Sequence, residues 1–379
     1  MHTLVEETDT AVKPAEDHDL TKLMEDMKKA RKEDFACPRN KLSLRWRDRH
    51  DAPSEDWAGY SVELDGDNDG YEFPANDHFI NQLAKKWPGM TGYSRMLRDT
   101  GQQDLLVHNV NEQLIRSEGT ALIRTVKKGS VNRARAILSD KYKIVDDQDV
   151  FDVAIPIIGE HGDTFRTLGG RSTDTNTFAK FITREPIATI GKREMFAGFQ
   201  LSNSEVGLGS AAFKAIFFDN FCENGCTFGN IELFQASFVH RGAKLQTKFG
   251  PVFGDEFKIA ETAAIRSAIA EATRKALDTK YHAQIADIIQ RGHDRKVTGD
   301  VVTVLDEVGK RVGLTEAERD QAKLHMDGSE AHAYGVQAAI TRLAQDSSSY
   351  GRRNELEAAG GKVLEFSDSA WNAVASLAA

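Results

Sequence analysis

The chain has 379 residues, of which 40% are hydrophobic and 28% are charged; this balance is typical of globular proteins and excludes a disordered chain. Its longest apolar runs, such as Ala211 to Phe218, are much shorter than the roughly 20 residues of a membrane-spanning helix. We therefore expect no transmembrane segment and no membrane partner. The net charge is −9, so a polyanionic partner would have to bind at a local basic patch.

The N-terminal stretch and the cysteines bear on the cellular compartment. The stretch is acidic and lacks the apolar core and small-residue cleavage site of a secretory signal. The cysteines are Cys37, Cys222 and Cys226, an odd number that argues for reduced thiols. Both features predict a cytoplasmic protein, in the cytosol of a host cell.

Three regions differ in composition, and we expect them to differ in structure. Residues 1–39 are highly charged and predict a leader that is mobile or only loosely docked, with a helical run from Lys22 to Phe35. Residues 40–255 predict an α+β domain, and residues 256–379 predict a helical region that is either separate or packed on the same core. We find no internal repeat of fixed period.

The expected domain alternates strands with a few helices. Short alternating segments between Asn40 and Tyr71 predict strands, and Asn76 with Asp77 predicts a helix start. That helix should stop at the turn formed by residues 87–89, and a second helix should run from Val110 to Glu118. From residue 121 to 221, β-favouring stretches separated by turns predict a mostly antiparallel sheet, interrupted by a helix over residues 147–155.

Beyond Phe257 the sequence becomes rich in alanine and predicts one long amphipathic helix or two in succession. Further helices are expected where a Ser, Thr or Asp precedes an apolar pattern. Their ranges are Val301 to Val312, Thr315 to Leu324, Ser329 to Ala344 and Ser369 to Leu377. The fold class is therefore α+β, with an Ala-rich helical C-terminal region.

Four blocks of the chain carry a resemblance to a known family. They are Phe73 to Leu97, His108 to Phe151, Leu201 to Gly225 and Ala333 to Asp346. In this order they are similar to segments of a phage and plasmid-like protein family catalogued as a domain of unknown function (number nine-three-two). The last block lacks part of the aromatic pattern of that family's closing helix. The resemblance spans residues 70 to 350 and implies a setting in mobile genetic elements, with no activity to transfer.

Three motifs suggest metal or nucleotide sites and are better explained without them. Residues 65–70, DGDNDG, match the start of a calcium loop, but Asn76 stands where the bidentate glutamate belongs. Gly207, Gly209 and Ala212 match a dinucleotide fingerprint but precede a β-favouring run, which predicts a hairpin turn. Cys222, Cys226 and His240 lack a fourth zinc ligand. We therefore expect no metal and no cofactor.

Charge placement is the most informative feature. Between residues 116 and 143 the chain carries eight basic residues against two acidic ones, which predicts a phosphate-binding stripe on a sheet face. The candidate residues are Arg124, Lys127, Lys128, Arg133, Arg135, Lys141 and Lys143. A second cluster places Trp46 between Arg45 and Arg47, where an indole could stack on an unpaired base. A third contains Arg241, Lys244, Lys248 and Phe249. Solvated strand faces paired with nearby carboxylates are the alternative explanation.

Three functions remain open from the sequence. The first is binding of nucleic acid, with single-stranded DNA as the favoured polymer, in replication or recombination of a phage or mobile element. The second is a structural or host-interaction role without catalysis, in which the helical C-terminal region allows a homo-oligomer. The third is a metal-dependent enzyme that uses Asp146, Asp147 and Asp149, although these residues are also suited to start a helix. No catalytic residue is assigned, and the balance leans away from an enzyme.

Overall fold

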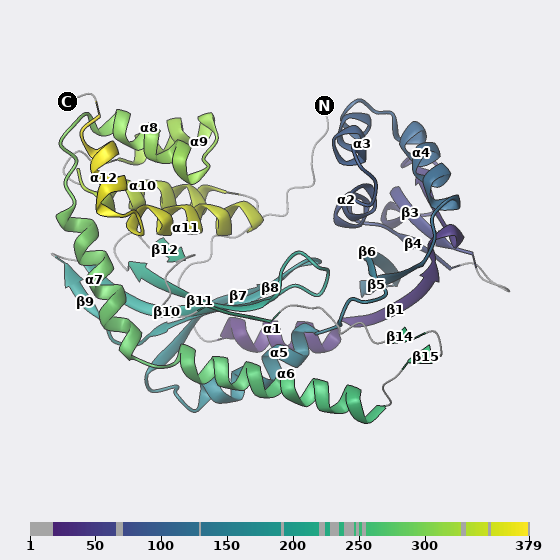
Figure 1. Cartoon of the computed structure of the whole chain (residues 1–379), viewed down its shortest axis with the longest axis horizontal. Coiled ribbons are helices and arrows are strands. Elements are labelled where there is room, and N and C mark those ends of the chain that lie inside the picture. The colour runs from purple at the N-terminus through teal and green to yellow at the C-terminus, as the bar shows by residue number, and fades with distance from the viewer. Residues whose placement is uncertain are drawn as a thin grey trace.

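The computed structural model describes residues 18–65, 71–128, 130–190, 193–219, 224–227, 235–238, 246–247, 250–251, 255–326, 331–347 and 350–377. Within these residues the fold is α+β, as predicted, and every pair of neighbouring strands in the sheets is antiparallel. No helix in the described ranges is long and apolar enough to span a membrane. Figure 1 shows a central sheet with an N-terminal part at one end and a bundle of C-terminal helices at the other.

The N-terminal part contains two three-stranded sheets and three helices. The first sheet has the order β1 (Arg31–Pro38), β5 (Thr120–Lys128), β6 (Val131–Ser139). The second has the order β2 (Leu42–Arg47), β3 (Gly59–Leu64), β4 (Tyr71–Pro74). The remaining elements are η1 (Arg39–Lys41), η2 (Glu55–Trp57), α2 (Asp77–Ala84), α3 (Met90–Asp99) and α4 (Gln103–Ile115).

Local hydrogen bonds explain where these elements lie. The Asn76 side chain accepts the N–H of Phe79 at 2.9 Å and caps α2, and Phe79 and Ile80 then enter the core. Asn111 of α4 satisfies both backbone groups of Leu44, at 2.7 and 3.0 Å. The Asn111 side chain therefore pairs with the backbone N–H and C=O of Leu44 at the edge of β2, as the backbone of a neighbouring strand would.

The central sheet has seven strands, and the long β10–β11 hairpin forms its middle. Its main order is β12 (Asn224–Thr227), β11 (Ala211–Asp219), β10 (Arg193–Asn203), β8 (Thr177–Thr183), β7 (Phe165–Ser172). Strand β13 (Gln235–Phe238) also pairs with β11, and β9 (Ala188–Ile190) pairs with β10. A separate two-stranded ladder joins β14 (Gln246–Thr247) and β15 (Gly250–Pro251).

One face of this sheet is covered by three helices. They are α1 (His18–Lys29), α5 (Asp147–Gly159) and α6 (Asp255–Ala276), which lie beneath the sheet in Figure 1. Phe181, Phe199 and Phe213 point into that layer, and the rings of Phe181 and Phe199 stack at 5.2 Å. Burial of each such ring contributes about 1.5–3 kcal/mol to the free energy of folding. Because side chains alternate between the two faces of a strand, the positions of these rings in β8, β10 and β11 determine which face of the sheet is buried under the helices.

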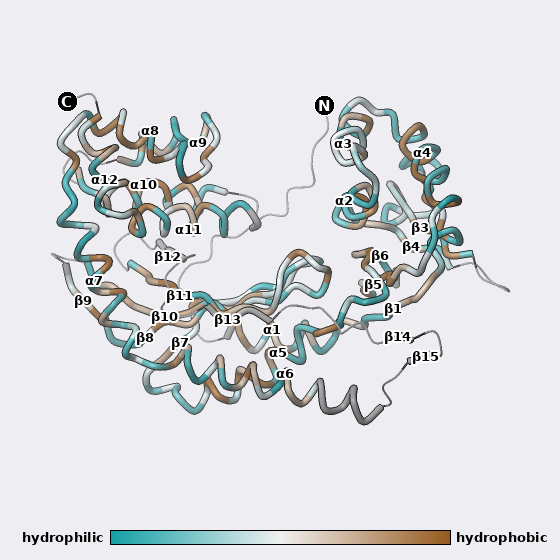
Figure 2. Tube along the Cα trace, viewed as in Figure 1, coloured by the Kyte–Doolittle hydropathy of each residue, from teal (hydrophilic) through white to brown (hydrophobic). Residues whose placement is uncertain are grey.

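The C-terminal region consists of helices with a core of their own. They are α7 (Lys280–Asp294), α8 (Val301–Val312), α9 (Glu316–His325), α10 (Ala333–Asp346), α11 (Tyr350–Leu364) and α12 (Asp368–Ala375). Trp371, Val308 and Ile340 lie in this second core, whereas α7 packs on β10 and β11 of the central sheet. In Figure 2 hydrophobic colours follow β10 and β11, while α7 and α11 alternate between hydrophilic and hydrophobic colours, as helices with one buried face do.

The sequence placed most of these elements and missed a few. Residues 18–38, predicted as part of a leader that is mobile or only loosely docked, instead form α1 and β1; Leu23 and Met27 are buried beneath the sheet, so that prediction is wrong for them. Helices α3 and α11 were not predicted. In α11, Gly360 and Gly361 weaken the helical signal, although Gly360 is needed because a Cβ there would lie 2.3 Å from the Thr341 side chain.

The packing of α1 predicts a stability effect. Replacing Leu23 with alanine should lower the free energy of unfolding by about 2–5 kcal/mol, because it removes apolar contacts and leaves a cavity. Lys22→Ala on the exposed side of the same helix is the matched control and should change stability by less than about 0.5 kcal/mol. Urea unfolding followed by circular dichroism measures both variants. Equal stability of the two would contradict the docking of α1.

Candidate nucleic-acid interface

The predicted stripe between residues 116 and 143 does not form one basic surface. Arg124 of β5 and Arg135 of β6 are 0% and 4% exposed, and both are enclosed where the N-terminal part meets the central sheet. Arg124 donates to Asp34 at 2.9 Å, to Asp146 at 2.6 Å and to the carbonyl of Glu205 at 2.9 Å. These two arginines cannot contact a phosphate without opening the fold, so their assignment as binding residues is wrong.

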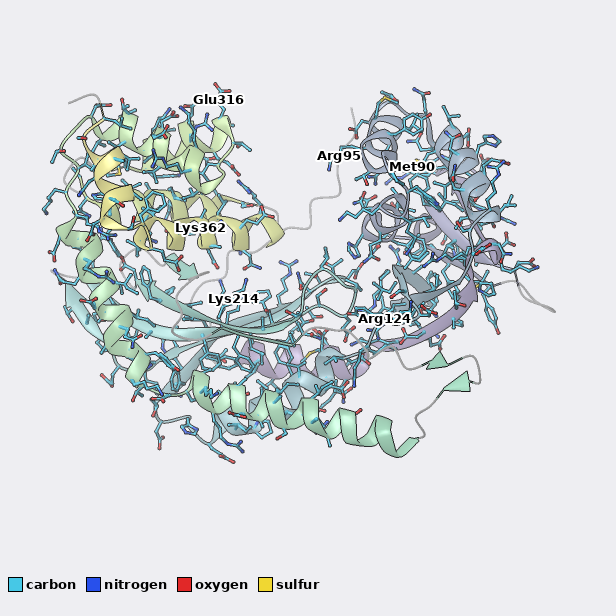
Figure 3. All side chains as sticks on the ribbon, in the orientation of Figure 1. Met90, Arg95, Arg124, Lys214, Glu316 and Lys362 are labelled. Atoms are coloured by element: carbon cyan, nitrogen blue, oxygen red, sulfur yellow. The ribbon has the colours of Figure 1, made fainter. Side chains whose placement is uncertain are left out.

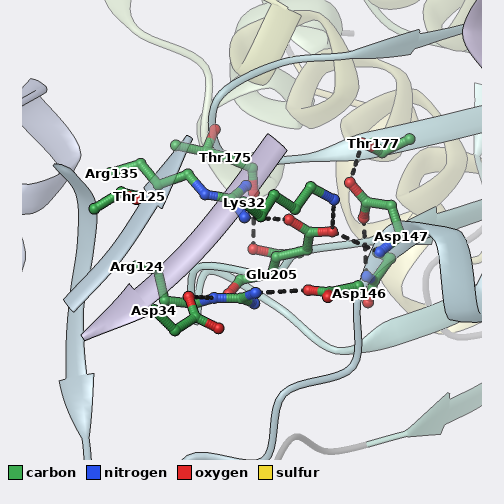
Figure 4. Close-up of polar contacts among 12 residues, drawn as sticks. Lys32, Asp34, Arg124, Thr125, Arg135, Asp146, Asp147, Thr175, Thr177 and Glu205 are labelled. Atoms are coloured by element: carbon green, nitrogen blue, oxygen red, sulfur yellow. Dashed lines mark hydrogen bonds and ion pairs between the residues drawn. The ribbon is translucent and has the colours of Figure 1, made fainter. Parts of the chain in front are cut away.

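Glu205 is the centre of this buried charge network (Figure 4). It lies in the turn between β10 and β11 and is 2% exposed. Its carboxylate pairs with Lys32 of β1 and Arg135 of β6, and it accepts the backbone N–H of Asp147 at 2.6 Å. The tip of the central hairpin is therefore fixed between the first strand of the chain, the β5–β6 hairpin and the start of α5.

The same turn makes further backbone contacts with the N-terminal part. His78 and Gln82 of α2 both reach the carbonyl oxygen of Val206, at 3.1 and 2.6 Å. Gly207 has a φ of +75°, and a Cβ there would lie 2.8 Å from the Leu138 side chain. A glycine is required at this tip for both reasons. The predicted hairpin turn at Gly207 and Gly209 is confirmed.

The three aspartates at the start of α5, namely Asp146, Asp147 and Asp149, act as structural groups. Asp146 caps the helix, and the Asp149 carboxylate accepts the N–H of Asp146 at 3.1 Å, which completes a capping box. Asp147 turns inward, where its carboxylate accepts from Thr177 at 2.6 Å and Asn203 at 2.9 Å. The helix-start interpretation is confirmed. Within the described ranges no group of three or more His, Cys, Asp and Glu side chains is arranged to hold a metal ion.

The pKa values of the two inner carboxyls, Asp147 and Glu205, shift in opposite directions. Burial, assisted by the charge of Glu205, raises the pKa of Asp147 from 3.8 to about 7. Burial also opposes the charge of Glu205, but Arg135 and Lys32 outweigh it and lower the pKa of that carboxyl to about 2. Glu205 is therefore the permanent anion of the network, and Asp147 is its proton-binding member.

The second predicted cluster is paired as well. Arg45 pairs with Glu63, and Arg47 pairs with Glu72 while its guanidinium lies 5.8 Å from the Trp57 ring. Trp46 is half-buried, packs on Tyr60 at 4.7 Å and donates to Asp48 at 3.3 Å. An indole held in this way is not presented for stacking on a base. The alternative explanation, strand faces paired with nearby carboxylates, fits this cluster.

The other predicted residues have different surroundings. Arg133 pairs with Asp56, and Lys143 is half-buried. Lys127 and Lys141 are exposed and make no ion pair with any described residue. The remaining predicted groups lie outside the described residues. They are the side chains of Lys128, Cys222, Cys226 and His240, the basic residues of the third cluster at residues 241–249, and residues 66–70 of the DGDNDG turn.

The structure brings together a different set of cations, on the face of the central sheet opposite α1, α5 and α6. We call it the basic face. Strand alternation and register place four basic residues on it, namely Arg166, Arg171, Lys180 and Lys214. Glu194, at the start of β10, is the one acidic residue that the described strands add to this face. The face therefore carries net positive charge on a protein whose net charge is −9.

The cations of the basic face differ in their partners. Lys180 lies 2.7 Å from both carboxylate oxygens of Glu357, which reaches down from α11. Arg166 lies 5.6 Å from the centre of the Phe196 ring. Lys214 is half-buried and has no hydrogen bond or ion pair with any described residue. Figure 3 shows Lys214 on the sheet between the N-terminal part and the C-terminal helices.

A second buried carboxylate anchors the C-terminal helices at the other end of the same hairpin. Asp219, the last residue of β11, accepts the Tyr334 hydroxyl at 2.5 Å and pairs with Arg193 at 2.9 Å. His293 of α7 stacks on Tyr334 at 4.2 Å, and burial, followed by His332, lowers the pKa of His293 to about 4. The β10–β11 hairpin thus positions the two parts that flank the basic face.

Sequence reasoning missed the basic face because its residues are spread over four strands. The available signal was a single lysine in the middle of each of two apolar strands, TFAKFIT and AAFKAIFFD. Charged residues are rarely placed in a fully buried strand, so each lysine marks a face that is not fully covered. The alternation of β8 and β11 puts both lysines on that face.

The raised pKa of Asp147 predicts a pH effect on stability. Its folded-state pKa lies above its unfolded value, so the folded state binds the extra proton and stability falls as pH rises from about 4 to about 7. Asp147→Asn removes this titration. The melting temperature of the variant should therefore rise relative to that of the wild type as pH increases across this window. A difference that stays constant with pH would contradict the assignment.

Comparisons with models of protein families, with curated proteins and with solved structures find no match to this chain.

Proposed function

We propose that this chain binds single-stranded DNA on the basic face of its central sheet. The observation that carries the proposal is the gathering of Arg166, Arg171 and Lys214 on one face of an acidic protein, beside Lys180, which also pairs with Glu357. Cations that lie together neutralise neighbouring phosphates and release the counterions that those phosphates had bound. The net charge of −9 repels DNA elsewhere, so binding is confined to this face.

The form of the face favours a single strand over a duplex. Lys180 and Lys214 lie on β8 and β11, one strand apart on either side of β10, which corresponds to about 10 Å. A row of this width follows one sugar-phosphate backbone, whereas duplex readout places a helix or a two-stranded ribbon in the major groove. Phe178 and Phe196 lie on the same side of the sheet but are buried, so the proposed contacts are those of the cations with phosphates.

The flanking parts add cations at both ends. Arg95 is exposed on α3, on the side that faces the C-terminal helices, and Lys362 is exposed on α11 (Figure 3). A strand lying along the sheet would pass between them. We further propose replication or recombination of a mobile element as the setting of such binding; this part rests on the sequence resemblance alone, since no family model matches the chain.

Charge reversal on the basic face tests the proposal. Lys214→Glu and Arg166→Glu should each weaken the binding of a labelled single-stranded oligonucleotide by about tenfold or more. Each should also reduce the slope of log K against log salt by about 0.7, since one phosphate contact is lost. Lys127→Glu and Lys141→Glu are the matched controls, because both lysines are exposed, unpaired among the described residues and outside the face.

Fluorescence anisotropy at several salt concentrations measures all four variants. Equal losses in the four variants would mean that the attraction has no fixed site and would remove the basic face from the proposal. No binding by the wild-type protein at low salt would overturn the function itself and would favour a structural or host-interaction role.

A further inference from the structure

Two histidines meet where the C-terminal helices join the end of the β10–β11 hairpin. His293 lies in the last turn of α7, and His332 is the residue that caps the start of α10. Their ring centres are 4.8 Å apart, and the His293 ring also stacks on Tyr334 at 4.2 Å. Tyr334 donates to Asp219 of β11 at 2.5 Å. The two rings therefore belong to the contact that holds α10 on α7 and on the central sheet.

The hydrogen bond made by His332 requires an uncharged ring. Its Nδ1 accepts the backbone N–H of Gly335 at 3.0 Å, which caps the first turn of α10. An imidazole nitrogen accepts a hydrogen bond only while it carries no proton, so the proton of the neutral ring belongs on Nε2. Protonation of Nδ1 would remove the cap and would set two N–H groups against each other.

His293 is the second ring that is unsuited to a charge. Its Nε2 is buried and has no hydrogen-bond partner among the described residues. A protonated imidazole carries an N–H at both nitrogens, so a charged His293 would leave a buried donor unpaired. An unpaired buried donor destabilises the state that contains it.

The charges around the two rings act in the same direction. Arg193 of β10 and Lys296, which follows α7, act on both rings as cations, and Asp219, the nearby anion, is already paired with Arg193 at 2.9 Å. Burial, followed by Lys296 and Arg193, lowers the pKa of His332 below its ordinary value of 6.5. Burial and His332 lower the pKa of His293 to about 4. Both rings are therefore uncharged at neutral pH.

We propose that His293 and His332 form an acid-sensitive lock, in which two uncharged rings hold α8 to α12 on α7 and the hairpin, and protonation of the rings releases those helices. Helices α8 to α12 share one core, so they leave the sheet as a unit. Release withdraws Glu357 of α11 from Lys180 and thereby frees a further cation on the basic face. The lock itself does not depend on DNA binding.

The direction of the pH effect follows from the lowered pKa values. In the released state each histidine returns to a pKa near 6.5, so the released state binds more protons than the docked state. Docking is therefore strongest above pH 6.5 and weakens as the pH falls toward 4. The shift of His293 alone raises the ratio of released to docked protein about 30-fold between about pH 7.5 and about pH 5.

Two backbone hydrogen bonds cross the junction and report its opening. The N–H of Val297 donates to the carbonyl of Ala331 at 2.9 Å, and the N–H of Ala333 donates to the carbonyl of Arg295 at 2.9 Å. Both bonds join the segment after α7 to the segment before α10. Hydrogen exchange of these two amides therefore detects release even when every helix stays folded.

Exchange of the full-length chain is measured by mass spectrometry at about pH 7.5 and about pH 5, with rates corrected for the intrinsic effect of pH. In wild type, the amides of Val297 and Ala333 should lose about 30-fold in protection at the lower pH. In the double variant His293→Phe, His332→Asn the loss should be about twofold or less. Phenylalanine keeps a ring against Tyr334, asparagine caps a helix, and neither side chain titrates.

Two controls isolate the lock from other effects of acid. Amides of α4, which packs in the separate core of the N-terminal part, should keep their protection at both pH values. His50→Asn, at an exposed histidine outside the junction, should behave as wild type.

Three outcomes would overturn the inference. They are full protection of Val297 and Ala333 at the lower pH in wild type, an equal loss in the double variant, and a loss of the same size in α4, which would indicate general acid unfolding. If the double variant does not fold, His293→Gln and His332→Asn are measured singly, and each should lose less protection than wild type. A loss equal to that of wild type in both single variants would then reject the lock.

Discussion

The carboxylate of Glu205 joins three segments that are far apart in the sequence. It pairs with Lys32 in the first strand and Arg135 in the β5–β6 hairpin, and it accepts the backbone N–H of Asp147 where α5 begins. Buried charges are tolerated only when they are paired and hydrogen-bonded, so each of these partners depends on the others. The position of the whole N-terminal part relative to the central sheet follows from this group.

The other end of the same hairpin repeats this arrangement. Asp219 holds Tyr334 and Arg193, and through Tyr334 it contacts the first turn of α10. One β-hairpin therefore carries a buried carboxylate at its tip and another at its far end, and each fixes a different part of the protein. The basic face lies between these two anchors, so the geometry of the proposed binding surface is set by contacts that do not touch a ligand.

The two classes of cation in this protein have different roles because they have different surroundings. The guanidinium groups of Arg124 and Arg135 are buried, and their charges are balanced by the carboxylates of Asp34, Asp146 and Glu205. Lys214 has no such partner among the described residues. Only an unpaired cation has its full charge available for a phosphate, which is why the count of basic residues between 116 and 143 overstated the binding potential of that segment.

The fold class and most helices and strands were predictable because they depend on local patterns. The capping aspartates before α5, the Asn76 cap and the hairpin turn at Gly207 are all readable within a few residues. The charge network was not, because its partners are separated by 90 residues for Arg124 and Asp34 and by 173 for Lys32 and Glu205. A single sequence does not state which distant carboxylate neutralises a given arginine.

The same limit applied to the docked N-terminal segment and to the basic face. The charged run from Lys22 to Phe35 is typical of a solvent-exposed segment. The structure shows that Leu23 and Met27 of α1 are buried against the central sheet. Lys180 and Lys214 are separated by 34 positions in the numbering and become neighbours of Gln200 only through strand register. Pairing of strands, and not the composition of a segment, created the surface.

Lysine acylation with and without single-stranded DNA, read by mass spectrometry, tests the location of binding most directly. The central claim is that DNA covers the basic face. We predict that DNA slows the modification of Lys214 while Lys127 and Lys141 react at unchanged rates. Protection of Lys127 and Lys141 with no change at Lys214 would contradict the claim. It would indicate that DNA binds near the β5–β6 hairpin, as the sequence alone predicted.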